Sequence, residues 1–263
     1  MKGTDRHRAK RSLGQNFLVE PAYAARITAA IDASAGDTVI EIGPGHGALT
    51  EKLVGAGANV IAIELDAGLC FELSEKFAGR PNFRLIEGDA LDVDYVSVAL
   101  GTVKLAANLP YNISTAILQK LAEHSQNFSV LVLMLQKEVV DRITAKPGSS
   151  ERGFLTVLVE SSFDARKLFD VPPAAFRPRP KVMSSVVQMV PAKNDIPARQ
   201  GFRRLLSTAF AQKRKTILNN LKVTFPHAAN ALAEAGIEER RRAESLTLEE
   251  WLRLHAIIGG HAG

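Results

Sequence analysis

The chain has 263 residues, 46% hydrophobic and 23% charged, which are the proportions of a folded globular protein with room for one large core and a smaller domain. Its single cysteine, Cys70, excludes an internal disulfide, and its six histidines fall into no metal-ligand pattern, so we expect no metal site. No apolar run is long enough to span a membrane and the N-terminal residues lack an apolar secretion signal, so we expect no membrane association and a cytoplasmic location.

Positive charge is concentrated at the two ends of the chain. The net charge is +5 at pH 7, but residues 1–12 carry five Lys and Arg against Asp5, and residues 195–263 carry eleven against seven Asp and Glu. The region between them is therefore net negative. This distribution indicates flanks that bind a polyanion around a centre that holds a small ligand, although a modest basic excess is also common on solvated helices.

The first part of the chain alternates strands and helices. Apolar residues at helical spacing predict a first helix over residues 21–33. Apolar and β-branched runs predict strands over residues 38–42, 59–63, 83–87, 103–107 and 130–135. This rhythm predicts a parallel sheet with helices on both faces.

A glycine loop, Gly43-Pro-Gly-His-Gly47, joins the first of these strands to a helix expected over residues 48–54. Strand, glycine loop and helix together are typical of a nucleoside or phosphate site, because glycines let the backbone approach a ligand closely. Glu64 ends the next strand, 21 residues after Gly43, where a carboxylate is placed to accept the hydroxyls of a ribose. We expect Asp66 to cap the following helix.

Two further turns follow strands at the same edge. Asp89, before Ala90, is equally consistent with a turn former and with a contact to adenine. The turn Asn108-Leu-Pro-Tyr111 by itself is equally a strand end around a buried tyrosine. Its Asn108 side-chain oxygen and Leu109 carbonyl are also placed to accept both N–H groups of a base's exocyclic amine, while Tyr111 offers a stacking face.

The glycine loop fits two classes of cofactor. Gly43-x-Gly45-x-x-Ala48 satisfies a loose dinucleotide fingerprint, which is also found in nicotinamide-dependent oxidoreductases. Glu41 favours S-adenosylmethionine instead, because a carboxylate facing the site attracts an ammonium or sulfonium and repels a pyrophosphate. No Tyr-x-x-x-Lys pair for hydride transfer is present. The methyl donor is the better interpretation.

The pattern changes after residue 150. We expect strands between Phe154 and Val190, with a proline-rich extended loop over residues 176–181 that either contacts nucleic acid or only connects strands. Apolar residues at helical spacing from Phe202 to Phe210, the basic run Lys213-Arg214-Lys215, and a capping box of Thr247 and Glu250 predict a small all-helical C-terminal domain after a linker.

Taken together in order, these motifs resemble the adenine N6,N6-dimethyltransferases of small-subunit ribosomal RNA. The stretches that carry the resemblance are Leu13-Gly-Gln-Asn-Phe-Leu18, Glu41-Ile-Gly-Pro-Gly-His-Gly-Ala-Leu-Thr50, Asn108-Leu-Pro-Tyr-Asn-Ile-Ser-Thr115, Met134-Leu-Gln-Lys-Glu-Val139, Lys146-Pro-Gly-Ser149, Val171-Pro-Pro173, Phe176-Arg-Pro-Arg-Pro-Lys-Val182, Ala209-Phe-Ala-Gln-Lys-Arg-Lys-Thr216, Asn219-Asn-Leu221 and Arg242-Ala-Glu-Ser-Leu-Thr-Leu-Glu-Glu250. Met183 and the triplet Arg152-Gly153-Phe154 depart from the family pattern.

The resemblance implies a Rossmann-like class I methyltransferase sheet over residues 1–192, which include a basic N-terminal arm, and a helical RNA-binding domain over residues 193–263. It implies S-adenosylmethionine as the cofactor and a transfer of two methyl groups to each of two adjacent adenines in a hairpin near the 3′ end of 16S RNA. The implied partner is small-subunit ribosomal RNA or a pre-30S particle, and we expect a monomer that contributes to ribosome biogenesis.

By the family pattern, Asn16 and Leu18 cover the donor, Gly43 contacts its methionine part, Glu64 binds ribose, Asp89 meets the adenine and Asn108 lies between donor and target. The full set expected to bind the cofactor is Asn16, Leu18, Glu41, Gly43, Gly45, Glu64, Asp89, Ala90 and Asn108. Asn108, Leu109 and Tyr111 are expected to act in catalysis. Tyr111, Phe176, Arg177, Lys213, Arg214 and Lys215 are expected to contact RNA.

Two alternatives to this function stay open. The large-subunit RNA methyltransferases that confer antibiotic resistance share the glycine loop and the Asn-x-Pro-Tyr turn, although the Phe-x-Pro-x-Pro-Lys-Val loop and the Gln-Lys-Arg-Lys-Thr stretch resemble the small-subunit branch. The second alternative is a ribosome-assembly or transcription factor that keeps the fold without catalysis. The intact glycine loop, Glu64 and Asn108 disfavour a purely binding role.

Overall fold

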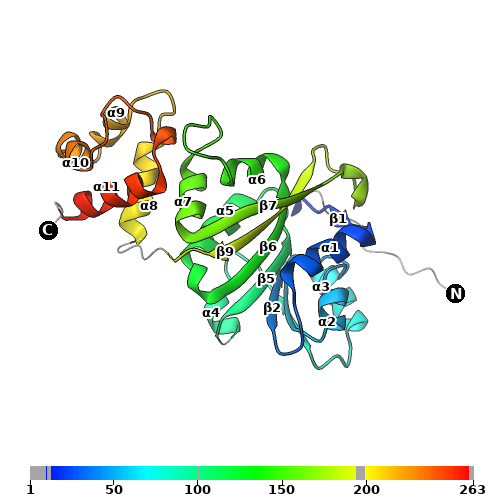
Figure 1. Cartoon of the computed structure of the whole chain (residues 1–263). Coiled ribbons are helices and arrows are strands. Elements are labelled where there is room, and N and C mark those ends of the chain that lie inside the picture. Colours follow the sequence, from blue (N-terminus) through cyan, green and yellow to red (C-terminus); the bar gives the residue numbers. More distant parts are fainter. Residues whose placement is uncertain (1–9, 11–12, 100, 194–198, 261–263) are drawn as a thin grey trace. The chain divides into compact units, whose positions relative to one another are not determined.

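A computed structural model describes residues 10, 13–99, 101–193 and 199–260 (Figure 1). The chain divides into two compact units, Met1–Val140 with Ala165–Pro191, and Asp141–Asp164 with Ala192–Gly263. The change at Pro191 lies next to the expected domain boundary. Residues 141–164, however, belong to the second unit, in a part of the chain that the sequence pattern assigned to the first. The functional roles assigned to the two domains stay predictions.

The first unit is built on a seven-stranded sheet with the order β4-β3-β2-β5-β6-β9-β7. The strands are β2 (Thr38–Ile42), β3 (Asn59–Glu64), β4 (Phe83–Glu87), β5 (Val103–Asn108), β6 (Phe128–Gln136), β7 (Phe163–Val171) and β9 (Ser184–Pro191). The first five are mutually parallel, and β9 pairs antiparallel with β6. The five strands predicted in the first part of the chain are confirmed, with ends within two residues of those expected, and β7 and β9 confirm the expectation of further strands before Val190.

Both faces of the central strands of this sheet are buried, as continuous apolar strands require. Along β2, for example, Val39 and Ile40 point to opposite faces and neither is exposed. The helices of this region are α1 (Pro21–Ile31), α2 (Thr50–Gly55), α3 (Ala67–Lys76), α4 (Tyr95–Val98), α5 (Ser114–Glu123) and α6 (Lys137–Ile143). Short segments complete the unit: β1 (Phe17–Leu18), η2 (Ser125–Asn127), η3 (Pro173–Ala175) and β8 (Phe176–Arg177). The fold is the mixed α/β sheet flanked by helices that the sequence predicted.

Apart from Phe163 and Asp164, where β7 begins, the regular secondary structure in the described residues of the second unit is helical. It contains α7 (Phe154–Ser162), α8 (Arg199–Ala209), α9 (Ile217–Leu221), α10 (Ala228–Glu234), η4 (Ala243–Ser245) and α11 (Leu248–Gly260). Phe202, Leu205 and Leu206 of α8 are buried, as their helical spacing predicted. No helix in the described part of the chain is long and apolar enough to cross a membrane.

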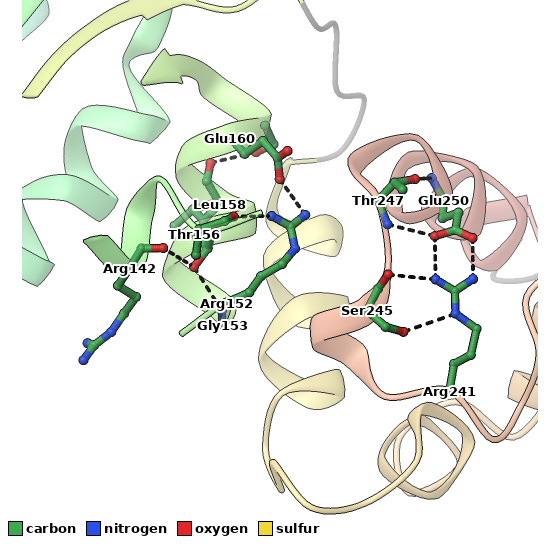
Figure 2. A network of polar contacts seen from close by, with 12 residues as sticks. Arg142, Arg152, Gly153, Thr156, Leu158, Glu160, Arg241, Ser245, Thr247 and Glu250 are labelled. Carbon is green, nitrogen blue, oxygen red and sulfur yellow. Dashed lines mark hydrogen bonds and ion pairs between the residues drawn. The ribbon is translucent and has the colours of Figure 1, made fainter. Parts of the chain in front are cut away.

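The expectation of a strand at Phe154 was wrong, because residues 154–162 form α7. Nearly all of this helix is buried, so its sequence lacks the polar face that reveals an amphipathic helix. Its start is fixed locally: the Thr156 hydroxyl accepts the Gly153 N–H at 3.0 Å and donates to the Arg142 carbonyl at 2.8 Å (Figure 2).

Arg152, one of the departures from the family pattern, is a structural residue of this unit. Its side chain is fully buried and pairs with Glu160 at 2.6 Å, and it also donates to the Ala145 carbonyl at 3.2 Å (Figure 2). A buried guanidinium requires such partners, because an unpaired charge in the interior is costly. The charge of Arg152, a residue that departs from the family pattern, is therefore balanced by the carboxylate of Glu160.

The C-terminal helix α11 is held by a network around Glu250 (Figure 2). Glu250 accepts two bonds from the Arg241 guanidinium, at 2.5 and 3.0 Å, and one from the Thr247 N–H at 2.8 Å. The Thr247 hydroxyl in turn accepts the Glu250 N–H at 3.2 Å, so the predicted capping box is confirmed. Arg241 also donates to the side chain and the carbonyl of Ser245. The network joins the loop before α11 to the first turn of the helix.

We expect Glu250→Ala to lower the free energy of unfolding by about 1–2 kcal/mol, because it removes a cap and a bidentate ion pair together. The Arg241 guanidinium holds the pKa of Glu250 below its usual value, so this stabilisation is present near neutral pH and is lost as the pH falls through the lowered pKa. Urea unfolding at several pH values measures both effects. Glu249→Ala is the matched control, because Glu249 is exposed in the same helical turn. Equal losses of unfolding free energy in Glu250→Ala and Glu249→Ala would contradict the capping and ion-pair role of Glu250.

Candidate functional site

One pocket gathers the residues that the sequence singled out. It lies at the carboxyl ends of β2, β3, β4 and β5, and residues 13–18, here called the strap, also line it. Every residue expected to bind the cofactor or to act in catalysis is among its lining: Asn16, Leu18, Glu41, Gly43, Gly45, Glu64, Asp89, Ala90, Asn108, Leu109 and Tyr111. The carboxyl edge of an open parallel sheet is where such folds bind ligands.

The glycine loop has a backbone that only glycine adopts readily. Gly43, Gly45 and Gly47 all have positive φ, at 65°, 58° and 79°. A Cβ added at Gly45 would lie 2.9 Å from Cδ1 of Phe17, so the strap covers this glycine at a distance that no side chain permits. The loop comes directly after β2 in the chain. The helix α2 begins at Thr50, two residues later than predicted.

The Glu64 carboxylate binds the backbone of two separate segments. It accepts N–H bonds from Gly45 at 3.3 Å, Leu65 at 3.0 Å and Asp66 at 2.9 Å. Burial, the largest influence, raises its pKa above the usual value, whereas these three bonds act to lower it. A carboxylate has about four lone-pair sites, so Glu64 keeps the capacity to accept a further donor.

Asp66 caps α3, as predicted, and also anchors the strap. Its side chain accepts the Gly68 N–H at 3.0 Å, the Lys10 ammonium at 2.8 Å and the Gln15 amide at 3.1 Å. Sequence reasoning identified only the cap, since the partners at residues 10 and 15 are remote in the chain. Gln15 thus lines the pocket and also anchors the strap, whereas Lys10 contributes only by holding the strap in position.

Glu41 is a second buried carboxyl in the pocket, 1% exposed. Burial, partly opposed by a 2.7 Å hydrogen bond from the Thr50 hydroxyl, raises the pKa of Glu41 to about 7. The charge of Glu64 acts in the same direction as burial. Two carboxyl groups in one sheltered pocket favour a cationic ligand and disfavour a pyrophosphate.

Asp89 is placed for both of the roles that the sequence left open. Its Oδ1 accepts the Leu91 N–H at 2.8 Å, which makes it a turn former, and the residue also lines the pocket. The neighbouring Ala90 carbonyl accepts the hydroxyl of the buried Tyr95 at 2.7 Å. The turn after β4 is therefore fixed from inside the fold.

Asn108, the last residue of β5, is oriented by the strap. Its side-chain amide donates to the Asn16 carbonyl at 3.1 Å. Because the N–H group is used in this way, the side-chain oxygen Oδ1 is the atom left to accept a hydrogen bond. The Leu109 N–H donates to the Met134 carbonyl of β6 at 3.2 Å, so the start of the turn is held by the sheet. Tyr111 is half-buried, and its hydroxyl lies 2.8 Å from the Ser184 hydroxyl.

Phe17 and His46 belong to the pocket although the sequence reasoning gave neither a role. Their rings lie 4.3 Å apart, and His46 Nδ1 lies 2.9 Å from a carboxylate oxygen of Glu72. Phe17 falls within the stretch that carries the family resemblance, and that position was the available signal. Its ring fills the space over Gly45.

The residues expected to contact RNA lie outside the pocket, except for Tyr111. Phe176 is 1% exposed and packs in the core, where β8 pairs with β1. In this conformation its ring presents no face to a base. Arg177, its neighbour, is exposed. Lys213, Arg214 and Lys215 form an exposed turn of the second unit, and Lys213 donates to the Ser150 carbonyl at 2.7 Å. Within the described residues, no group of three or more His, Cys, Asp and Glu side chains is arranged to hold a metal.

A largely parallel sheet with a glycine loop, two buried carboxyl groups and an asparagine at the end of β5 is the arrangement of a Rossmann-like methyltransferase. The profile of the ribosomal RNA adenine dimethylase family matches residues 6–259. The chain is 44% identical to the ribosomal RNA small subunit methyltransferase A of Geobacter sulfurreducens, covering 97% of this chain and 96% of that one, and 43% identical to the protein of that name in Pseudomonas putida, covering 94% of each.

Two solved structures have the same fold over nearly the whole chain. A dimethyladenosine transferase from Plasmodium falciparum superposes with a TM-score of 0.79 at 28% identity, covering 90% of this chain and 96% of that one. A 23S rRNA methyltransferase superposes with a TM-score of 0.72 at 25% identity, covering 93% and 100%. The chain belongs to the ribosomal RNA adenine dimethylase family. The resemblance and the methyltransferase class are thereby confirmed, and the oxidoreductase alternative is set aside.

We expect the Glu41 carboxyl to make stability depend on pH. Its pKa of about 7 lies above the unfolded value of 4.5, so its contribution is fully present below the unfolded value and is lost as the pH rises through 7. Relative to Glu41→Gln, the wild type should lose about 2 kcal/mol of unfolding free energy between pH 5.5 and pH 8. Urea unfolding of both proteins without ligand measures this. Parallel pH curves for the two proteins would contradict the assignment.

Proposed function

We propose that this protein methylates N6 of two adjacent adenines in the 3′-terminal hairpin of small-subunit ribosomal RNA, adding two methyl groups to each. Family membership supports the reaction, and the relatives named as small-subunit enzymes support the substrate. The observation that carries the proposal is the position of Asn108, which lines the same pocket as two buried carboxyl groups and whose amide nitrogen, rather than its oxygen, bonds to the strap.

The pocket residues fit S-adenosylmethionine. The carboxyl groups of Glu41 and Glu64 suit its cationic part, the glycine loop admits a ligand close to the backbone, and Glu64 and Asp89 suit the hydroxyls and adenine of a nucleoside. Asn16 and Leu18 of the strap would cover it. When bound, this cofactor supplies an electrophilic methyl group on a sulfonium.

The chain's own contribution is to position the adenine amine. That amine is a poor nucleophile, because its lone pair is delocalised into the ring. Asn108 Oδ1 and the Leu109 carbonyl accept its two N–H bonds and draw the lone pair out of the ring plane, while the Tyr111 ring stacks on the base. The proton released on transfer passes to water, so no histidine base is required.

Two alternatives are weaker on specific observations. The likeness to a 23S rRNA methyltransferase is at 25% identity, whereas small-subunit relatives reach 43–44% over nearly the whole chain. A role in assembly without catalysis does not require the glycine loop, Glu64 and Asn108 to be intact in one pocket. A pre-30S particle as the substrate, a monomeric state and a cytoplasmic location complete the proposal.

For RNA affinity, we propose the exposed run at residues 213–215, together with Arg177 and the basic N-terminal arm. Residues 1–9 of the arm lie outside the described part of the chain. Cations that neutralise phosphates contribute affinity that falls as the salt concentration rises.

We expect the wild type to incorporate labelled methyl groups from S-adenosylmethionine into two adjacent adenines of unmethylated small subunits. Asn108→Ala should bind the donor as the wild type does and lose most of the turnover, since the amine then lacks an acceptor. Mapping of the modified nucleotides, with large subunits as a parallel substrate, measures both. Methylation of the large subunit alone would overturn the substrate, and near-native turnover of Asn108→Ala would overturn the role of that residue.

We expect neutralisation of Lys213, Arg214 and Lys215 by glutamine to weaken RNA binding at low salt and to reduce the slope of log affinity against log salt concentration by about 2. Binding to small subunits over a salt series measures the slope. Neutralising Arg80, Arg84 and Arg166, which are exposed in the first unit, removes the same charge and serves as the control. An equal change in both variants would show that net charge, and not residues 213–215, determines the affinity.

A further inference from the structure

The Tyr111 hydroxyl has a hydrogen-bond partner that neither the sequence motifs nor the family resemblance assigns. It lies 2.8 Å from the hydroxyl of Ser184, 73 residues later in the chain. Tyr111 is half-buried, whereas Ser184 has no exposed surface. A buried hydroxyl pair of this length is a full hydrogen bond.

Ser184 is held firmly at the start of β9. Its backbone is in register with Gln136 at the end of β6, and the carbonyl of the preceding Met183 accepts the Lys137 N–H at 2.9 Å. β6 also holds the start of the Asn108 turn, through the bond from the Leu109 N–H to Met134. Ser184 and the Asn108 turn are therefore both held by β6.

The Tyr111 side chain, in contrast, stands on a loop. Its residue lies beyond the end of β5 and before α5, and its carbonyl accepts the Ser114 hydroxyl at 3.1 Å. A ring on such a turn can rotate about two side-chain torsions unless its far end is held. The bond to Ser184 acts at that far end, on the hydroxyl, and leaves the faces of the ring available for stacking.

We propose that Ser184 is a positioning residue for the methyl transfer: its hydroxyl holds the Tyr111 ring in the orientation that receives the target adenine. The proposal rests on the proposed function and deepens it. A phenylalanine at position 111 would stack as well as tyrosine does, because stacking needs only the ring. The tyrosine hydroxyl contributes by preorganising that ring, which reduces the cost of ordering it when the base is captured.

The test is a double-mutant cycle of Ser184→Ala and Tyr111→Phe in the full chain, with unmethylated small subunits and labelled S-adenosylmethionine. Each single variant should raise KM for the subunits by roughly 3- to 10-fold, the equivalent of one hydrogen bond, and should change kcat less. The affinity for the donor should not change. The double variant should be no worse than either single variant, because both remove the same bond.

Ser185→Ala is the matched control. Ser185 is the next residue of β9, also has no exposed surface, and also donates one side-chain hydrogen bond, to Asp170 at 2.5 Å. Its side chain points to the opposite face of the strand. This variant should lose at least as much stability to urea as Ser184→Ala, because the acceptor of its hydrogen bond is a carboxylate, with KM for the subunits unchanged.

The outcomes separate this role from a purely structural one. A native KM in Ser184→Ala, multiplicative effects of the two substitutions, or an equal rise of KM in Ser185→Ala would each overturn the positioning role while leaving the proposed function intact. A wild type that incorporates no methyl groups into small subunits would overturn the proposed function, and this role with it.

Discussion

The arrangement of the site depends on the Glu64 carboxylate and the backbone N–H groups that it binds. In the glycine loop, the Gly43 N–H donates to the Ile63 carbonyl at the end of β3, whereas the Gly45 N–H donates to the Glu64 side chain. Glu64 also accepts two N–H groups from its own turn. Without this carboxylate, the buried N–H groups of Gly45 and Asp66 would each carry a desolvation cost of about 1–3 kcal/mol. One side chain thus closes the pocket floor and keeps capacity for a ligand.

A series of hydrogen bonds connects the turn after Glu64 to Asn108, at the other end of the pocket. Asp66, two residues beyond Glu64, holds Lys10 and Gln15, and the strap that they anchor presents the Asn16 carbonyl to Asn108. The asparagine that we assign to the target amine is therefore oriented by a segment 92 residues earlier in the chain. The end of the pocket that we assign to the nucleoside and the end that we assign to the target amine are therefore joined by one connected set of hydrogen bonds.

Features with a local cause were predictable from the sequence. The five parallel strands follow from their apolar runs, and the caps at Asp66 and Thr247 follow from short-range spacing. The pocket residues at the strand ends follow from the rule that ligands bind where parallel strands end, whereas Asn16 and Leu18 were expected only from the family resemblance. Features with a tertiary cause were not. The helix α7 is buried on most sides and so lacks periodicity, and Phe176 looked accessible in a loop of cations although strand pairing buries its ring. The partnership of Tyr111 with Ser184 depends on which strands become neighbours, which no local pattern encodes.

The second unit draws its residues from two places, 141–164 and 192–263, with a return to the main sheet between them. Its helix α7 packs against α8 and α11, which come from the later segment. A chain cut at residue 191 would consequently keep α7 but lose the helices that cover it, exposing the buried leucine and valine side chains of α7. The smaller unit is thus not a removable appendage, because its core needs the excursion of the chain before β7 as well as the residues after β9.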